Sequence, residues 1–543
     1  MSGERIYLYD TTLRDGAQTQ GVDFTVPDKT AIAHALDQLG IDYIEGGWPG
    51  ANPTDDAFFA DAPVLVRARF AAFGMTKRAG RSAANDPQVS ALLNVRAQAV
   101  SIVGKSSSRQ VRDALSVTLE ENLETIADTV KAIVAAGREA LFDAEHFFDG
   151  YKSDPEYALK AVRAAYDNGA RWVVLCDTNG GRLPNEIGEI VREIAKVIPG
   201  DHLGIHCHND TENAVANSLA AVAAGARMVQ GTINGLGERC GNANLVALLP
   251  SLTLKLGYAT GVTAEGLKHL KHVSRMVDDR LNRAPSRTAA YVGESAFAHK
   301  GGLHVSAVEK DPTLYEHVDP ELVGNTRHII VSDQAGKSNI LSRFREIGLE
   351  IDPKDKRVAG LVDQVKQLEF EGYAYDGAEA SFELMARRAL DGVPTYFQLQ
   401  SFRVLDERRF DLLGKLETLS EATVKVAVGE ELIMSVAEGN GPVNALDGAL
   451  RKALVPHYAE LAGIRLVDYK VRILKGTDGT GAVTRVMIES ADEEGQRWTT
   501  VGVSANIIEA SFEALEDSLT WRLFHKSAKI IPLPTGGRRA KRG

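Results

Sequence analysis

The sequence has few cysteines and no long apolar run. Only 3 of its 543 residues are cysteine, and no two of them form a C-x-x-C pair. This excludes a disulfide framework and indicates reduced thiols. No segment approaches the roughly 18 consecutive apolar residues of a membrane-spanning helix, and the start MSGERIYLYD has no signal-peptide core. We therefore expect a cytoplasmic protein with no membrane partner.

Positive charge is also in short supply, and several catalytic and nucleotide-binding motifs are missing. Lys and Arg number 62 against 73 Asp and Glu, a net charge of −11, which disfavours nucleic acid or acidic lipid as a partner. No P-loop or G-x-S-x-G segment occurs, and no G-x-G-x-x-G follows the first expected strand, which argues against NAD. The expectation that remains is a folded protein that recognises small molecules.

The first half of the chain alternates short apolar runs with amphipathic stretches of helical length. The apolar runs are typical of buried strands, and eight of them start at Arg5, Ile41, Arg67, Ala97, Glu139, Arg171, His202 and Arg227. Eight such units in about 250 residues are typical of a TIM barrel, although a doubly wound sheet has a similar local pattern. We predict an α/β fold in which residues 1–260 form a catalytic TIM (β/α)8 barrel.

The second half of the chain has a different texture. Residues 261–400 are mostly helical and charged, which predicts small helical linker subdomains. Residues 401–535 are β-rich and contain a weak internal repeat, in which Val424 and Val486, and Asn444 and Asn506, share one offset. This pattern predicts a pseudo-duplicated α+β domain that regulates and dimerises. Residues 536–543 are expected to form a solvated basic tail.

The segment HCHND carries the strongest chemical signal. Strand alternation places His206 and His208 on one face and Cys207 on the other, so the two imidazoles can share a divalent metal. The alternative is that they only form hydrogen bonds in the core. Asp15 favours the metal, because a barrel brings the carboxyl ends of all its strands to one rim, where Asp15 and the histidines can converge.

Other polar residues follow the expected strands at the same rim. Arg14 is interpreted as a fixed cation for charge developing on a carbonyl oxygen, against the alternative of a surface ion pair. Glu145, flanked by phenylalanines, is a candidate acid or base with a raised pKa, or else a partner in a loop salt bridge. Thr178 is a candidate carboxylate ligand and Asn242 a candidate oxygen ligand to the metal, whereas Asp10 is a rim acid or a core polar group.

Several segments in this order resemble one enzyme family. DTTLRDGAQ, IEGGWPG, DTNG, GIHCHND and GLGERCGNANL are similar to the DRE-TIM metallolyases, in the Claisen-condensing branch of 2-isopropylmalate, homocitrate and citramalate synthases. The resemblance covers nearly the whole chain and extends to FAHKGGLHVSAV of the helical subdomain. RDGAQTQGVDF, EGGWPGANPTDDAFF and FDAEHFFDGY look most like the bacterial citramalate synthases. Ala17 and Trp48 depart from the usual isopropylmalate synthase pattern.

The resemblance implies a role for each site residue. It makes Asp15, His206 and His208 metal ligands with Asn242 as their neighbour, the metal being Mg²⁺ or Mn²⁺ with Zn²⁺ as the alternative. Arg14 would polarise the keto oxygen and Thr178 would hold the 2-oxoacid carboxylate. The other catalytic candidates are Glu145, His304 and Tyr315. In this branch, the residues that correspond to His304 and Tyr315 often come from the partner subunit.

The activity implied is the condensation of acetyl-CoA with pyruvate to (R)-citramalate, in isoleucine biosynthesis. Trp48 is expected to fill the pocket for this small acceptor, against the alternative of barrel packing. The other hypotheses are a 2-isopropylmalate synthase that uses 2-oxoisovalerate and a catalytically silent, amino-acid-sensing binding protein. The resemblance further implies a homodimer with an amino-acid-binding regulatory domain, for which isoleucine, or else leucine, is the expected effector. The Gly-rich segments at residues 438–442 and 501–505 are the candidate effector-binding turns, against the alternative of a domain that only dimerises.

Overall fold

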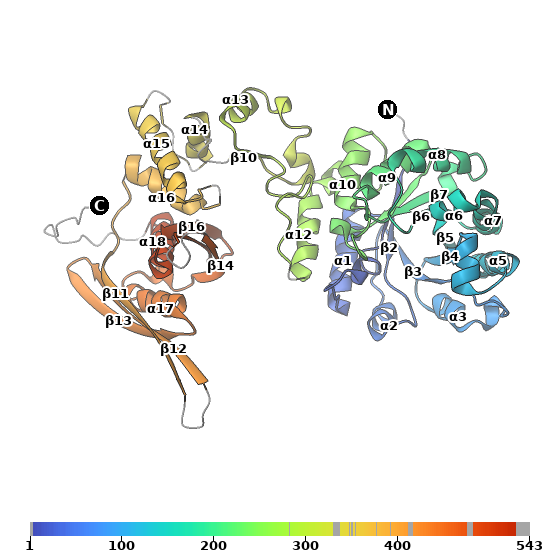
Figure 1. Ribbon diagram of the computed structural model, residues 1–543, viewed down its shortest axis with the longest axis horizontal. Coiled ribbons are helices and arrows are strands. Elements are labelled where there is room, and N and C mark those ends of the chain that lie inside the picture. The colour runs from blue at the N-terminus through green and yellow to red at the C-terminus, as the bar shows by residue number, and fades with distance from the viewer. Residues whose placement is uncertain are drawn as a thin grey trace. The chain divides into compact units, whose positions relative to one another are not determined.

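The chain folds into two compact units, which are described separately. The structure, a computed structural model, describes residues 4–281, 283–329, 337–346, 348, 351–352, 355–375, 377–390, 392–410, 416–474 and 482–527 (Figure 1). The first unit comprises Met1–Ala298 and Glu316–His328, and the second comprises His299–Tyr315 and Ile329–Gly543. The basic tail expected at residues 536–543 lies outside the described residues.

The first unit contains a closed barrel of eight parallel strands in sequential order. The barrel closes where Tyr7 of the first strand pairs with Met228 of the last. Each strand coincides with one of the eight runs expected from the sequence, although β4 extends one residue beyond its run, to Lys105, so the predicted TIM barrel is confirmed. The strands are β1 (Tyr7–Asp10), β2 (Tyr43–Glu45), β3 (Arg69–Met75), β4 (Ala99–Lys105), β5 (Glu139–Glu145), β6 (Trp172–Asp177), β7 (Leu203–Cys207) and β8 (Met228–Gly231).

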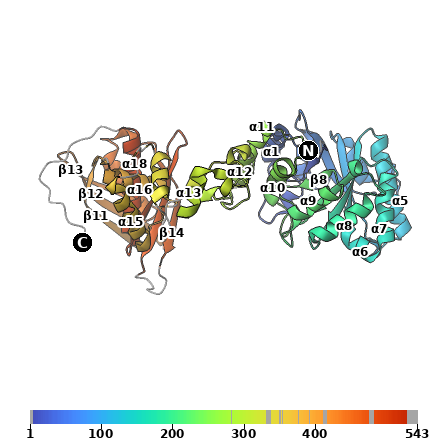
Figure 2. The ribbon, with the colours of Figure 1, turned by 90° about the horizontal axis from the view of Figure 1, so that it is seen from above.

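Helices surround the barrel, and their ends follow local sequence signals (Figure 2). Helix α1 starts with a capping box between Thr25 and Asp28 and ends at Gly40, whose φ of 104° suits glycine. The helices are α1 (Val26–Leu39), α2 (Pro53–Ala60), α3 (Pro87–Asn94), α4 (Ser108–Gln110), α5 (Leu119–Ala135), α6 (Phe147–Ser153), α7 (Pro155–Tyr166), α8 (Pro184–Ile194), α9 (Ala214–Ala224), α10 (Leu245–Pro250), α11 (Ala264–Leu267) and α12 (Leu270–Arg280).

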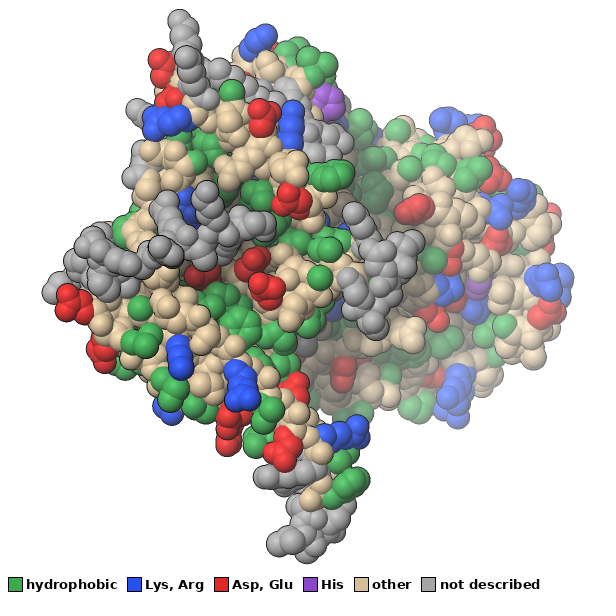
Figure 3. All heavy atoms as spheres, turned by 60° about the vertical axis from the view of Figure 1, so that its left-hand side comes forward, with side chains coloured by type: hydrophobic (Ala, Val, Ile, Leu, Met, Phe, Trp, Pro, Cys, Tyr) green, Lys and Arg blue, Asp and Glu red, His purple; other side chains and the backbone are tan. Residues whose placement is uncertain are grey.

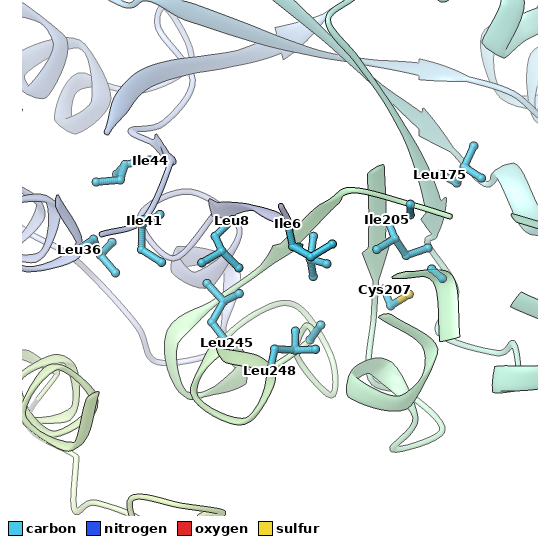
Figure 4. Packing of buried hydrophobic residues seen from close by; sticks show 14 of the residues in the cluster. Ile6, Leu8, Leu36, Ile41, Ile44, Leu175, Ile205, Cys207, Leu245 and Leu248 are labelled. Carbon is cyan, nitrogen blue, oxygen red and sulfur yellow. The ribbon is translucent and has the colours of Figure 1, made fainter. Parts of the chain in front are cut away.

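Two cores lie on opposite faces of the barrel wall. Side chains that alternate outward, such as Leu8 and Cys207, pack with helix residues such as Leu36 and Leu248 (Figure 4). The inward side chains form a smaller apolar cluster that includes Trp172, the first residue of β6. Cys207 therefore faces away from the barrel interior, as the alternation in HCHND predicts.

The second unit contains helices followed by two similar sheet-and-helix motifs. The helices are α13 (Gly302–Lys310), α14 (Lys337–Glu346), α15 (Lys356–Glu371) and α16 (Glu379–Leu390). The short strands β9 (Ala298–His299) and β10 (His328–Ile329) pair with each other, and each lies at a point where the chain passes from the first unit to the second. The first motif is β11 (Gln398–Phe410), β12 (Leu416–Val428), β13 (Glu431–Gly439) and α17 (Pro442–Leu454). The second is β14 (Arg465–Ile473), β15 (Thr484–Ala491), β16 (Arg497–Ser504) and α18 (Ile507–His525).

The internal repeat expected from the sequence is confirmed by these motifs. Val424 and Val486 both lie on the middle strand of their sheet and are fully buried.

The space-filling view shows hydrophobic side chains among acidic and basic ones on the face that comes forward (Figure 3). In β13, Leu432 and Met434 remain exposed. Of the helices in the described part of the chain, none combines the length and apolar character needed to cross a membrane.

Candidate active site

Three side chains that could bind a metal ion converge at the carboxyl end of the barrel. Asp15 lies in the turn after β1, His206 lies on β7, and His208 directly follows β7. One ligand atom from each side chain lies within 4.8 Å of the other two, and all three residues are buried. His206 Nε2 is 3.5 Å from Asp15 Oδ2. A carboxylate with two imidazoles at this spacing suits a divalent cation.

The protonation states of the cluster also suit a cation. Burial and the neighbouring His206 lower the pKa of His208 to about 4, so this imidazole is neutral near pH 7. Burial alone would raise the pKa of Asp15, but Arg14, His206 and His208 lower it below its ordinary value. The cluster therefore combines an ionised carboxylate with at least one neutral imidazole, the forms in which these side chains bind metals.

Asn242 completes the cluster on one side. Its backbone pairs with His208 in an isolated antiparallel bridge. Within the described residues, the Oδ1 atom of Asn242 and the Nδ1 atom of His208 are buried and lack a hydrogen-bond partner. Buried polar atoms are rarely left unpaired, and a bound cation with its water ligands would account for both. The side chains present therefore fit a metal ion at this position.

Arg14 is fixed beside the cluster by a buried carboxylate. Its Nε donates to Glu45 on β2, and Tyr9 donates to the other carboxylate oxygen of Glu45 at 2.7 Å. Its Nη1 lies 3.6 Å from Asp15 Oδ1, and its guanidinium carbon lies 3.8 Å from the ring centroid of Phe73. Arg14 is therefore a preorganised cation next to the candidate metal centre and does not form the surface ion pair considered as its alternative.

Trp48 and Asp10 take different places near Arg14 and the barrel rim. The Trp48 ring packs edge-on against Phe73 with centroids 5.5 Å apart, so both Trp48 and Arg14 contact the same phenylalanine. Asp10 is fully buried and accepts hydrogen bonds from the backbone and hydroxyl of Thr12. Asp10 is thus a satisfied core group, one of the two alternatives that the sequence left open.

Glu145 is the last residue of β5, and Thr178 directly follows the neighbouring strand β6. Glu145 Oε2 lies 2.5 Å from Lys105 Nζ, and its other oxygen lies 3.9 Å from His146 Nε2. The hydroxyl of Thr178 accepts a hydrogen bond from the His146 backbone N–H at 2.8 Å. His146 has a left-handed φ of 58°, a conformation that is unusual for a non-glycine residue and is often associated with functional sites.

His304 and Tyr315 contact each other in the second unit. Their ring centroids are 4.3 Å apart with an interplanar angle of 32°. His304 is exposed, and Tyr315 is 45% exposed. The two rings are therefore neighbours in the second unit, and their catalytic roles are proposals.

A layer of buried polar side chains below the cluster was missed from the sequence. His206 Nδ1 is 2.9 Å from Gln230 Oε1, and Gln230 Nε2 donates to Asp143 Oδ1 at 2.9 Å. Ser101 donates to the other carboxylate oxygen of Asp143 at 3.0 Å. Burial raises the pKa values of Asp143 and Glu45. The signal available in the sequence was Asp143, an acid within an apolar strand run, two positions before Glu145.

Comparison with known proteins agrees with this geometry. Residues 5–277 match the HMGL-like family, residues 291–372 the homocitrate synthase post-HMGL domain-like family, and residues 376–521 the LeuA allosteric (dimerisation) domain. The last match supports a dimer.

Two curated relatives match nearly the full chain. The (R)-citramalate synthase of Aquifex aeolicus (strain VF5) is 52% identical over 522 residues, which cover 96% of this chain and 98% of the relative. That of Geobacter sulfurreducens (strain ATCC 51573 / DSM 12127 / PCA) is 50% identical, covering 97% and 98%. A 2-isopropylmalate synthase of Dictyoglomus turgidum (strain DSM 6724 / Z-1310) is more distant, at 30% identity and coverage of 93% and 96%. The chain therefore belongs to the HMGL-like family and, within it, to the (R)-citramalate synthases.

Proposed function

We propose that this enzyme condenses acetyl-CoA with pyruvate and water to give (R)-citramalate and CoA. The observation that carries the proposal is the convergence of Asp15, His206 and His208 beside the fixed guanidinium of Arg14. A site of this kind can activate a 2-oxoacid, and the curated relatives at about half identity are (R)-citramalate synthases.

The cation proposed for the cluster is Mg²⁺ or Mn²⁺, with Zn²⁺ as the alternative. Asp15, His206 and His208 would hold it, with Asn242 as an additional oxygen neighbour. When bound, such a cation supplies Lewis-acid polarisation of the acceptor's keto group. The mixed oxygen and nitrogen ligands are compatible with all three ions.

The remaining steps are assigned to side chains of this chain. A base removes a proton from the acetyl methyl group, and the resulting carbon nucleophile forms a bond to C2 of pyruvate. Arg14 stabilises the negative charge that develops on the former keto oxygen, and Thr178 binds the pyruvate carboxylate. The proton removed from the methyl group is returned to the former keto oxygen, which becomes the hydroxyl of citramalate. Water then adds to the thioester carbonyl and the C–S bond breaks, so that a carboxylate and a proton form and CoA leaves as a thiol.

Glu145 and His304 are the two candidates for the base. Glu145 stands at the carboxyl end of β5, whereas His304 stacks with Tyr315, which would position the thioester or assist His304. Exchange of the acetyl-CoA methyl protons with heavy water distinguishes them. Substituting the true base by Gln or Ala abolishes exchange. Substituting a residue that is needed only for thioester hydrolysis leaves exchange intact. Exchange that persists in both variants contradicts both assignments.

Pyruvate is proposed as the acceptor because the site has an aromatic wall. Trp48 packs against Phe73, and Phe73 also contacts Arg14. In this proposal the two aromatic rings form the wall that selects pyruvate over the branched side chain of 2-oxoisovalerate. The test is to identify the product formed from acetyl-CoA and pyruvate by chiral chromatography. Formation of (R)-citramalate by the wild type, and its loss in Asp15→Ala, His206→Ala and Arg14→Ala variants that remain folded, supports the proposal. Near-normal turnover in these variants contradicts the site.

Isoleucine, or else leucine, is proposed as an effector of the second unit. In the two segments considered for effector binding, Gly439 ends β13 and Gly502 lies within β16, so residues 501–504 are strand and not a turn. Both glycines lie against a helix, since a Cβ at Gly502 would lie 2.0 Å from the Ala510 carbonyl oxygen and one at Gly439 would lie 2.5 Å from the Ala445 nitrogen. We therefore base the proposal on the LeuA allosteric (dimerisation) domain match. Titration calorimetry with both amino acids, and CoA release in their presence, tests it. A full-length enzyme that ignores both contradicts this regulation.

A further inference from the structure

The hydrogen bonds beneath the metal cluster converge on the Asp143 carboxylate, which accepts from Ser101 on one side and from Gln230 on the other. Ser101 Oγ donates to Asp143, Gln230 Nε2 donates to Asp143, and Gln230 Oε1 is thereby turned toward His206 Nδ1. We call Ser101, Asp143 and Gln230 the relay. They lie on β4, β5 and β8 respectively, and each is at most 5% exposed. Because an amide oxygen can only accept a hydrogen bond, His206 Nδ1 must carry the proton.

The orientation of the Gln230 amide matters because His206 has a competing partner. Its Nε2 lies 3.5 Å from Asp15 Oδ2, so a proton on Nε2 would be attracted to the Asp15 carboxylate. In that tautomer, the proton on Nε2 would hydrogen-bond to the Asp15 carboxylate, and Nε2 would have no lone pair to bind a cation. A neutral imidazole holds one proton, and the acceptor at Nδ1 therefore decides whether Nε2 is free.

We propose that Asp143 and Gln230 are positioning residues that hold His206 in its Nδ1–H tautomer and so keep Nε2 available to the cation. The inference rests on the metal site of the proposed function. Gln230 acts directly on His206, and Asp143 acts by fixing which end of the Gln230 amide faces the imidazole. Burying these polar groups within the barrel is costly unless all their hydrogen bonds are made, which makes the amide orientation well defined.

The polarity of the relay allows a paired substitution test. In Asp143→Asn, Ser101 continues to donate to the side-chain oxygen, so the introduced NH₂ group faces Gln230 and favours the opposite amide orientation, with Nε2 toward His206. Adding Gln230→Glu restores an acceptor for Nδ1–H, and its second oxygen accepts from the introduced NH₂ group. The double variant also retains one carboxylate and one amide, as in the wild type. Gln230→Met removes the acceptor without changing the side-chain length.

The measurement is the Kd for Mn²⁺ alone, determined by electron paramagnetic resonance of free Mn²⁺ with the full-length, metal-free protein. Substitutions next to a metal-ligating histidine typically weaken metal binding about 10- to 100-fold. We expect a loss of that size in Gln230→Met and in Asp143→Asn, and recovery to within about threefold of the wild type in Asp143→Asn/Gln230→Glu. Gln98→Met, at a glutamine that bonds the Phe70 backbone at 2.9 Å, is the matched control and should bind normally.

The outcomes separate the relay from the site itself. Wild-type binding with unchanged affinity in both single variants overturns the relay but leaves the metal site. A double variant that is folded by circular dichroism yet binds no better than Asp143→Asn overturns the polarity argument. If the wild type does not bind Mn²⁺, the metal site is wrong and the relay falls with it.

Discussion

His206 Nε2 lies 3.5 Å from Asp15 Oδ2, although the two residues belong to opposite ends of the barrel sequence. The barrel closes by pairing β1 with β8, and β7 is next to β8, so the carboxyl ends of β1 and β7 are near one another. The pair is buried with His208 beside it. This arrangement makes cation binding at the barrel mouth the first property to test.

Cation binding should stabilise the folded barrel. A ligand that binds only the folded state adds about 2.7 kcal/mol at a concentration of 100 Kd. We expect saturating Mn²⁺ to raise the melting temperature of the wild type and to have no such effect in His208→Ala. The matched control is His202→Ala, because His202 bonds the Arg171 carbonyl at the other end of β7. Equal Mn²⁺ stabilisation of the wild type and His208→Ala would contradict the ligand set.

Removing Glu45 should destabilise the barrel by leaving Arg14 buried without its partner. Breaking one side of a buried ion pair typically costs about 3–5 kcal/mol, so Glu45→Gln should lower the free energy of unfolding by up to that amount. The control is Glu156→Gln, which removes the pair with Lys160, a side chain that is 57% exposed; such surface pairs contribute about 0–1 kcal/mol. Urea denaturation followed by circular dichroism compares the two, and similar losses would contradict a special role for the Arg14 pair.

Shortening Trp48 should relax the selection against larger acceptors. Filling or emptying an apolar pocket by a small group is worth about 1–3 kcal/mol, so Trp48→Val should raise the ratio of kcat/KM for 2-oxoisovalerate to that for pyruvate about tenfold or more. Steady-state CoA release with each acid gives this ratio. An unchanged ratio with normal pyruvate turnover would assign Trp48 to barrel packing.

The second unit should lose stability in acid through Glu383. Burial alone would raise the pKa of Glu383, but hydrogen bonds from His525, Arg387 and Trp521 lower it to about 2, from an ordinary value of 4.5. Its stabilising contribution is therefore complete above pH 4.5 and is lost as the pH falls toward 2.

The matched variant for this prediction is Glu383→Gln. Trp521 donates to Glu383 at 2.8 Å, so tryptophan fluorescence can follow unfolding of this region. The difference in stability between wild type and variant should shrink as the pH is lowered from 5 to 3. A stability difference that stays constant over this range would contradict the lowered pKa of Glu383.

The barrel and the convergence of Asp15 with the two histidines could be predicted from the sequence, whereas the buried hydrogen-bonded residues beneath them could not. Each strand is an apolar run between polar segments, and barrel topology brings Asp15 and His206 together regardless of their separation. Asp143 occupies an inward position of β5, which alternation identifies. Its partner Gln230 depends on the distance across the closed barrel from β5 to β8, which no local pattern specifies. The pairing of Asn242 with His208 likewise arises between two loops.

Acceptor preference is the most direct measure of the central claim. Initial rates of CoA release with saturating acetyl-CoA should be measured for pyruvate, 2-oxoisovalerate and 2-oxoglutarate with one preparation of the full-length enzyme. The account predicts the highest kcat/KM for pyruvate, by about tenfold or more over 2-oxoisovalerate, since one or two methyl groups can be discriminated to this extent. A higher kcat/KM for 2-oxoisovalerate would contradict it and assign the chain the activity of a 2-isopropylmalate synthase.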